Sequence, residues 1–132
     1  MKDLLAKLET ATETEQEELI LEALQYAYAQ DWIKLVITGK AGRWVRQGAF
    51  LSAAMVLVPE GWLFNRMDQM SSWTAKAVKS PIPTEKWWTV ELYEWGKDKD
   101  GLSKGRAVTA PLTVTIASLK AHDAQRTERS HP

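Results

Sequence analysis

A short stretch of the sequence combines basic and aromatic side chains and contains no acidic residue. Its members are Trp32, Lys34, Lys40, Arg43, Trp44 and Arg46. Lysine and arginine can neutralise phosphates while tryptophan rings stack on bases, so the stretch could bind nucleic acid. Arginine and tryptophan also anchor many protein interfaces. These six residues are therefore our candidate partner-binding site. The alternative is that both tryptophans are core residues and the basic side chains solvate a loop.

Histidine offers little scope for catalysis or metal binding. His122 falls near the end of the last predicted helix, and His131 lies in the C-terminal tail. Asp123 follows His122, but neighbours on a helix point about 100° apart and do not easily chelate one ion. We expect His122 to be a surface histidine near a helix C-terminus. A nucleophile elbow of the G-x-S-x-G type is also missing. The sequence predicts no catalytic residue, no metal and no cofactor, and a protein that is not an enzyme.

Two further patterns resemble functional motifs without matching them. Residues 39–43 provide glycines and a lysine, as a phosphate-binding loop does, but Ala41 stands where that motif requires Ser or Thr. A connecting turn is the better interpretation. Glu91 and Glu94 would fall on opposite faces of a strand, so they cannot act as a glycosidase-like pair.

The charges of this 132-residue chain cancel overall but are segregated along it. Residues 1–31 carry eight acids and two lysines, whereas residues 32–49 carry four basic residues and no acid. The simplest interpretation of the acidic run is a solvated helix face whose glutamates favour the positive end of the helix dipole. The absence of cysteine excludes disulfides and thiolate metal sites.

Length and hydropathy predict one domain, residues 1–124, followed by a flexible tail, residues 125–132. No apolar run approaches the roughly 20 residues that span a bilayer, and the N-terminus lacks the apolar core of a signal peptide. We therefore expect a cytoplasmic protein with no membrane partner.

The apolar periodicity predicts a small α+β fold. Helices are expected at residues 2–10, 14–29, 49–58 and 109–123, with Thr109 as N-cap of the last. Strands are expected at residues 62–68, 72–79 and 86–95, as an antiparallel meander of three to four strands within 62–95. Residues 58–62 mark the change from helix to strand because Pro59 disfavours helical backbone before it and Gly61 permits a bend.

Three segments are less clear from the sequence. Residues 32–38 could form a strand or continue a helix, and their β-branched side chains favour a strand. The glycines in residues 39–42 then favour a loop, and residues 102–108 read as a mobile connection. Trp87, Tyr93 and Trp95 would share one mixed strand face, either covered by a second helical layer or open to a partner.

Residues 49–62, with their Leu-Val-Pro-Glu-Gly-Trp ending, and residues 107–121, with their Thr-Ala-Pro-Leu start, resemble segments of small, uncharacterised phage and prophage proteins. Residues 4–9 with Ala11 and Thr12 resemble the N-terminus of the same proteins. The three segments occur in the family order. The chain thus resembles the phage alpha-beta-alpha sandwich domain family, which implies helices on both faces of the sheet. Gly48 stands where that family usually has a helix-starting Thr or Ser.

The resemblance implies a phage-encoded accessory protein in the cytoplasm of a bacterial host. Because catalytic groups are not recognisable, we expect it to act by binding a protein of the host or the phage. Inhibition of a host defence system, in the manner of an anti-CRISPR protein, is one role that such a binder would serve. The alternative is a nucleic-acid-binding accessory that uses residues 32–46. Exposed aromatic side chains would also permit a homo-oligomer.

Overall fold

The structure, a computed structural model, describes residues 1–70, 87–96 and 102–130. Its elements follow in chain order: α1 (Lys2–Thr10), η1 (Glu13–Glu15), α2 (Gln16–Ala29), α3 (Leu35–Arg46), α4 (Phe50–Met55), β1 (Trp62–Met70), β2 (Trp87–Glu94), β3 (Leu102–Ala107) and α6 (Ala110–Ser130). The strands form one antiparallel sheet in the order β1-β2-β3. The small α+β fold with an antiparallel sheet is therefore confirmed, but the third strand is β3, which lies beyond the range 62–95 predicted for the meander.

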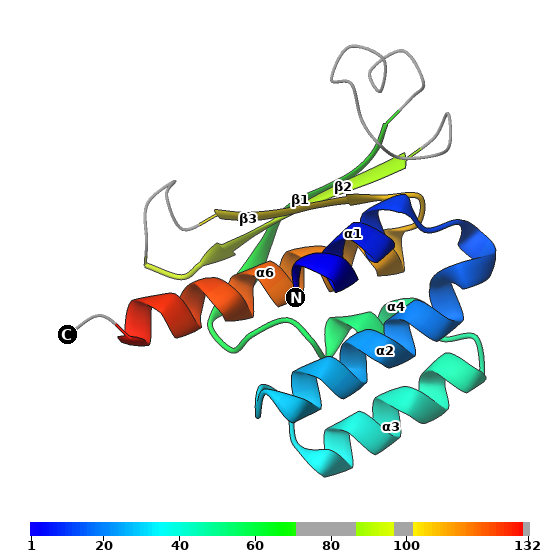
Figure 1. Cartoon of the computed structure of the whole chain (residues 1–132). Coiled ribbons are helices and arrows are strands. Elements are labelled where there is room, and N and C mark those ends of the chain that lie inside the picture. Colours follow the sequence, from blue (N-terminus) through cyan, green and yellow to red (C-terminus); the bar gives the residue numbers. More distant parts are fainter. Residues whose placement is uncertain (71–86, 97–101, 131–132) are drawn as a thin grey trace.

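Helix α6 lies at the centre of the molecule (Figure 1). On one side it contacts β2 and β3, and on the other it contacts α1, α2 and α4. Two apolar clusters result. One joins α6 to the sheet through Val114, Ala117 and Ala121, and the other joins α6 to the helices through Leu112, Ile116 and Leu119. The helix is buried all round over this stretch, as expected of a helix inside a core.

In the described part of the chain, the helices lie on one side of the sheet, and α3 is the layer farthest from it (Figure 1). The opposite sheet face carries exposed polar side chains such as Lys104 and Arg106. The order of layers is therefore sheet, α6 with α1, then the remaining helices. Residues 1–70, 87–96 and 102–130 do not include a helix on the other face of the sheet, so the second helical layer that the family resemblance implies stays an expectation.

Side-chain hydroxyls explain how α6 starts and how it tolerates threonine. The Thr109 Oγ1 accepts a hydrogen bond from the Leu112 N–H at 3.3 Å and donates to Gln16 at 2.9 Å. Thr109 is thus the predicted N-cap. Thr113 and Thr115 donate their hydroxyl protons to the carbonyl oxygens four residues earlier, so these buried polar groups are satisfied.

Helix α6 and strand β3 approach each other closely at Gly105. A Cβ at this position would lie 2.5 Å from the Thr113 carbonyl oxygen and 3.0 Å from the Ala117 backbone nitrogen. Two positions along the strand, the Ser103 Oγ donates a hydrogen bond of 2.7 Å to the Ala117 carbonyl. Gly105 therefore allows the strand backbone to touch the helix backbone.

Several boundaries predicted from the sequence were wrong. Residues 35–46 form helix α3 rather than a strand followed by a loop, because Thr38, Ala41, Gly42 and Val45 form its buried stripe. Residues 102–107 form β3 rather than a mobile connection. Helix α6 continues to Ser130, into the segment expected as a tail. The strand predicted at residues 72–79 lies outside the described residues.

Gly48 was expected at the start of a helix, but it lies at the end of one. It adopts a φ of 83° directly after α3, where its N–H donates to the Val45 carbonyl and the Ala49 N–H donates to the Trp44 carbonyl. These two bonds form a Schellman motif. Gly48 therefore terminates α3, and Ala49 is the N-cap of α4.

Gly105→Ala should destabilise the fold by about 2–3 kcal/mol because the added methyl group meets helix backbone rather than a movable side chain. Gly39→Ala is the control. Gly39 lies inside α3 with no atom near its would-be Cβ, so alanine there should stabilise by about 1 kcal/mol. Urea unfolding of the two variants measures both changes, and an unaltered Gly105→Ala midpoint would contradict the close approach.

Candidate partner-binding surface

The predicted basic residues lie on the outward side of α3. Lys40, Arg43 and Arg46 are exposed, while the buried stripe of the helix packs towards α2 and α4. Gly42 lies against α2, since a Cβ at this position would be 3.9 Å from the Leu21 side chain. Lys34 is exposed at the N-cap position. The outer layer of the molecule is thus a basic helix without an acidic side chain.

The first turn of the same helix exposes three aliphatic side chains in succession. Leu35 is 65% exposed, Val36 78% and Ile37 38%. Single exposed aliphatic residues are common on protein surfaces, but adjacent ones beside a charged rim are typical of interaction sites. We call this group of residues the α3 surface: Leu35, Val36, Ile37, Lys40, Arg43 and Arg46.

Trp44 is half-buried and does not offer an open ring. It packs against the helical core, and the Lys40 Nζ lies 5.2 Å from its ring centroid. This cation-π contact covers ring surface that a nucleic-acid base would need for stacking. Trp44 therefore supports Lys40 on the helix.

Trp32 is also engaged within the fold. Asp31 adopts a φ of 62° after α2, and its N–H donates to the Tyr28 carbonyl while the Trp32 N–H donates to the Ala27 carbonyl. This is a second Schellman motif. The hydrophobic contact that often accompanies the motif is present, because the Trp32 ring lies edge-on to Tyr26 at 5.6 Å. Of the two tryptophans in the predicted site, neither is free to stack on a base.

Asp31→Gly should stabilise the protein by about 0.5–1 kcal/mol because glycine adopts a positive φ without strain. The change also removes a negative charge from the C-terminal end of α2, where the helix dipole disfavours it. Gly48→Asp makes the reverse change at the equivalent position after α3 and should destabilise by a similar amount. Chemical unfolding measures the stability of both variants. Two changes in the free energy of unfolding with the same sign would contradict the prediction.

His122 is buried rather than at the surface, contrary to the sequence-based expectation. Its ring is stacked on Trp32 with centroids 4.8 Å apart, and its Nε2 lies 2.7 Å from the Leu57 carbonyl oxygen. Since a carbonyl only accepts, Nε2 carries the ring proton. Burial lowers the pKa of His122 below its ordinary value of 6.5, and the bond to Leu57 opposes this shift. Neutral His122 therefore holds α6 to the α2–α3 connection through Trp32 and to the α4–β1 connection through Leu57.

Because the folded pKa of His122 is lowered, the unfolded chain binds the proton more readily than the folded protein. The contribution of His122 to the free energy of unfolding should be constant above about pH 6.5. It should fall as the pH drops from there through the folded pKa. His122→Gln keeps an N–H donor for Leu57 without titrating, so its stability should depend less on pH over this range. Urea unfolding at several pH values measures the difference, and identical slopes for the two proteins would contradict it.

A cleft of about 510 Å³ opens beside Trp32 and His122. Asp31, Glu60 and Gln125 also line it. Within the described ranges, no three histidine or carboxylate side chains come together to hold a metal ion. The cleft shows no nucleophile paired with a base among these residues.

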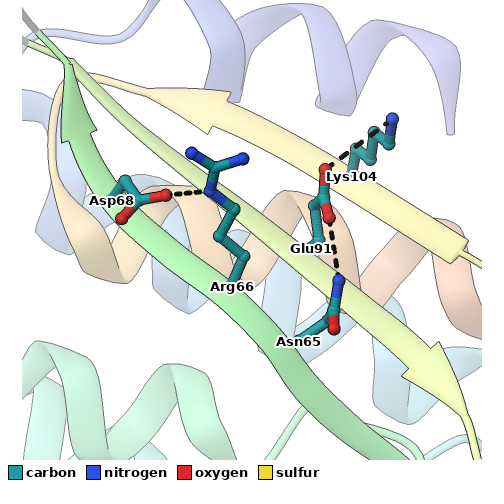
Figure 2. Close-up of polar contacts among 5 residues, drawn as sticks. All are labelled: Asn65, Arg66, Asp68, Glu91 and Lys104. Carbon is teal, nitrogen blue, oxygen red and sulfur yellow. Dashed lines mark hydrogen bonds and ion pairs between the residues drawn. The ribbon is translucent and has the colours of Figure 1, made fainter.

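The sheet face opposite α6 carries two separate groups of paired polar side chains (Figure 2). Glu91 accepts a hydrogen bond of 3.1 Å from the Asn65 amide and lies 3.7 Å from the Lys104 ammonium, and Arg66 pairs with Asp68. Exposed pairs of this kind contribute little stability. Sequence reasoning missed the Glu91–Lys104 pair because it requires β3, which brings Lys104 opposite Glu91.

The aromatic residues predicted on this strand face differ in exposure. Trp87 is buried and Tyr93 is half-buried, whereas Trp95 is 73% exposed at the end of β2. Tyr93 lies opposite Leu63 of β1 and Leu102 of β3, which makes an apolar row across the sheet. Of the two alternatives that the sequence left open for this face, Trp87 is covered, whereas Trp95 is open to solvent.

Comparisons of this chain with protein-family models, with curated proteins and with solved structures gave no match. Among the described residues, no helix combines the length and the hydrophobicity needed to cross a membrane.

Proposed function

We propose that this chain is a binding protein whose α3 surface docks on a protein partner that presents both acidic and apolar groups. With the resemblance to phage proteins, this leads us to a phage-type accessory protein that meets its partner in the cytoplasm of a bacterial host. Inhibition of a host defence protein, as by an anti-CRISPR protein, is the role that we infer for such a binder.

The observation that carries the proposal is the adjacency of exposed aliphatic and basic side chains on one helix. Leu35 and Val36 are among the most exposed large apolar residues of the described chain. No ion pair involves Arg43 or Arg46 among the described residues. Aliphatic groups gain by leaving water, and unpaired cations favour an acidic partner. Together they fit a partner with an apolar centre and an acidic rim.

A protein partner accounts for these features better than nucleic acid does. Aliphatic side chains gain nothing from a phosphate backbone, and single-strand binding depends on open aromatic rings. Trp32 is stacked on His122 and Trp44 is covered by Lys40. The four basic residues of the segment remain suited to phosphates, so nucleic-acid binding stays the second candidate.

The test uses a partner captured from host extract, purified and titrated against variants by calorimetry. Lys40→Glu with Arg43→Glu should weaken binding by roughly a hundredfold, because two attractive contacts become repulsive. Val36→Ser should weaken it by about tenfold, since an apolar contact is lost. Lys2→Glu with Lys104→Glu alters the net charge equally outside the α3 surface and should leave affinity within about twofold.

Unchanged affinity of the Lys40→Glu with Arg43→Glu variant would contradict the proposal. The second candidate is tested with DNA and RNA oligonucleotides at low and moderate salt. A phosphate-binding surface should lose affinity steeply as salt rises, and the slope should become smaller when Lys40 and Arg43 are replaced by alanine. Binding of this kind, without a protein partner, would replace the proposed function with the nucleic-acid alternative.

A further inference from the structure

The molecule carries a second surface whose charge is opposite to that of the α3 surface. A cleft of about 620 Å³ lies between α1 and α2 and is lined by Lys7, Glu15, Glu18, Leu21, Glu22 and Gln25 among others. We call it the α1–α2 cleft. Three carboxylates face one ammonium group there, so its charge is negative. The acidic N-terminal segment and the basic residues 32–49 thus contribute to two separate surfaces of opposite charge.

The carboxylates of the cleft differ in how they are engaged. Glu15 accepts hydrogen bonds from the Thr12 N–H at 3.0 Å and the Thr12 hydroxyl at 2.8 Å, which lower the pKa of Glu15 and keep it ionised. Glu22 lies 3.4 Å from the Lys7 ammonium. Glu18 has no ion pair among the described residues. Glu15 and Glu18 therefore supply the uncompensated negative charge.

The charged residues of the α1–α2 cleft and those of the α3 surface have the same spacing when α2 of one copy and α3 of another run in opposite directions. Glu15, the N-cap of α2, is followed by Glu18 and Glu22 of α2 at spacings of three and four residues. Arg43, Lys40 and Val36 have the same spacings along α3 read backwards. Each stripe spans about 10 Å at 1.5 Å per residue. An antiparallel α3 would therefore place its arginine at the first carboxylate and its lysine at the second.

The apolar side chains fit the same alignment. At the third position Val36 would meet the part of the cleft where Glu22 is already paired with Lys7 and where Leu21 is half-buried. The aliphatic end of α3 would thus lie against an apolar side chain rather than an uncompensated carboxylate. Both the charges and the apolar groups are complementary in this arrangement.

We propose that a second copy of this chain is one occupant of the α3 surface, with α3 of one copy lying antiparallel in the α1–α2 cleft of the next. The inference rests on the proposed function in one respect, since both use the α3 surface. The two contacting surfaces differ, so the interface is heterologous and assembles rings or open chains rather than a two-fold dimer. The zero net charge of the chain puts no overall repulsion against such assembly.

Sedimentation velocity and a charge exchange test this interface. The wild-type protein should associate with rising concentration at low salt and return to monomer at high salt, because the contacts are exposed and screened. Lys40→Glu with Arg43→Glu places like charges at the interface, and so does Glu15→Lys with Glu18→Lys, which changes the two carboxylates that would face Arg43 and Lys40. Each variant alone should remain monomeric. An equimolar mixture should associate again, because every contact between the two variants then joins opposite charges.

A wild-type protein that stays monomeric at low salt, or a mixture that stays monomeric, would overturn the inference. Circular dichroism of each variant shows whether it is folded. The Glu15→Lys with Glu18→Lys variant separates the two proposals, because its α3 surface is intact and it should still bind the captured partner. If the wild-type protein does not self-associate but still binds the captured partner, the inference fails and the proposed function stands.

Discussion

The contact between α6 and β3 is the constraint on which the rest of the structure depends. The strand has no room for a side chain at Gly105, and the Ser103 hydroxyl bonds to a helix carbonyl beside it. Such a backbone-to-backbone approach fixes the distance of the whole sheet from the helix, because β1 and β2 follow β3 through their hydrogen bonds. The sheet then occupies one side of α6, and the other side is left for the remaining helices.

The position of α3 follows from this arrangement. Because α6 is buried on both sides, the helices of the N-terminal half must stack outward from it, and α3 is the last of them (Figure 1). Its inner side is buried through Thr38, Ala41 and Val45. Nothing in the described chain covers its outer side, so whatever residues stand there form the molecular surface. The apolar and basic character of that surface is therefore set by the sequence of one helix.

The sequence predicted what local rules determine and missed what distant contacts determine. Helix α1 was predicted with its observed bounds, and Thr109 was predicted as the cap of α6. Helix α3 was missed because its glycines suggested a loop, whereas Gly42 serves packing against α2. Strand β3 was missed for a similar reason at Gly105. The stacking of Trp32 on His122 joins residues far apart in the chain, so no local pattern indicates it. The basic residues of α3 could be grouped by charge patterning without knowledge of the fold, and the structure exposes Lys40, Arg43 and Arg46 on one side of that helix.

The residues of α3 are poor choices for a helix whose only role is structural. Lys34 places a positive charge at the positive end of the helix dipole and provides no side-chain cap. Val36 and Ile37 are β-branched, and Gly39 sits in the helix interior without a packing reason. Helix α3 therefore depends on its contacts with α2, and its outer residues add little to its stability. Local choices that oppose the fold tend to occur where function requires them. The proposed contact of α3 with a partner would account for the exposed aliphatic side chains and the unpaired cations together.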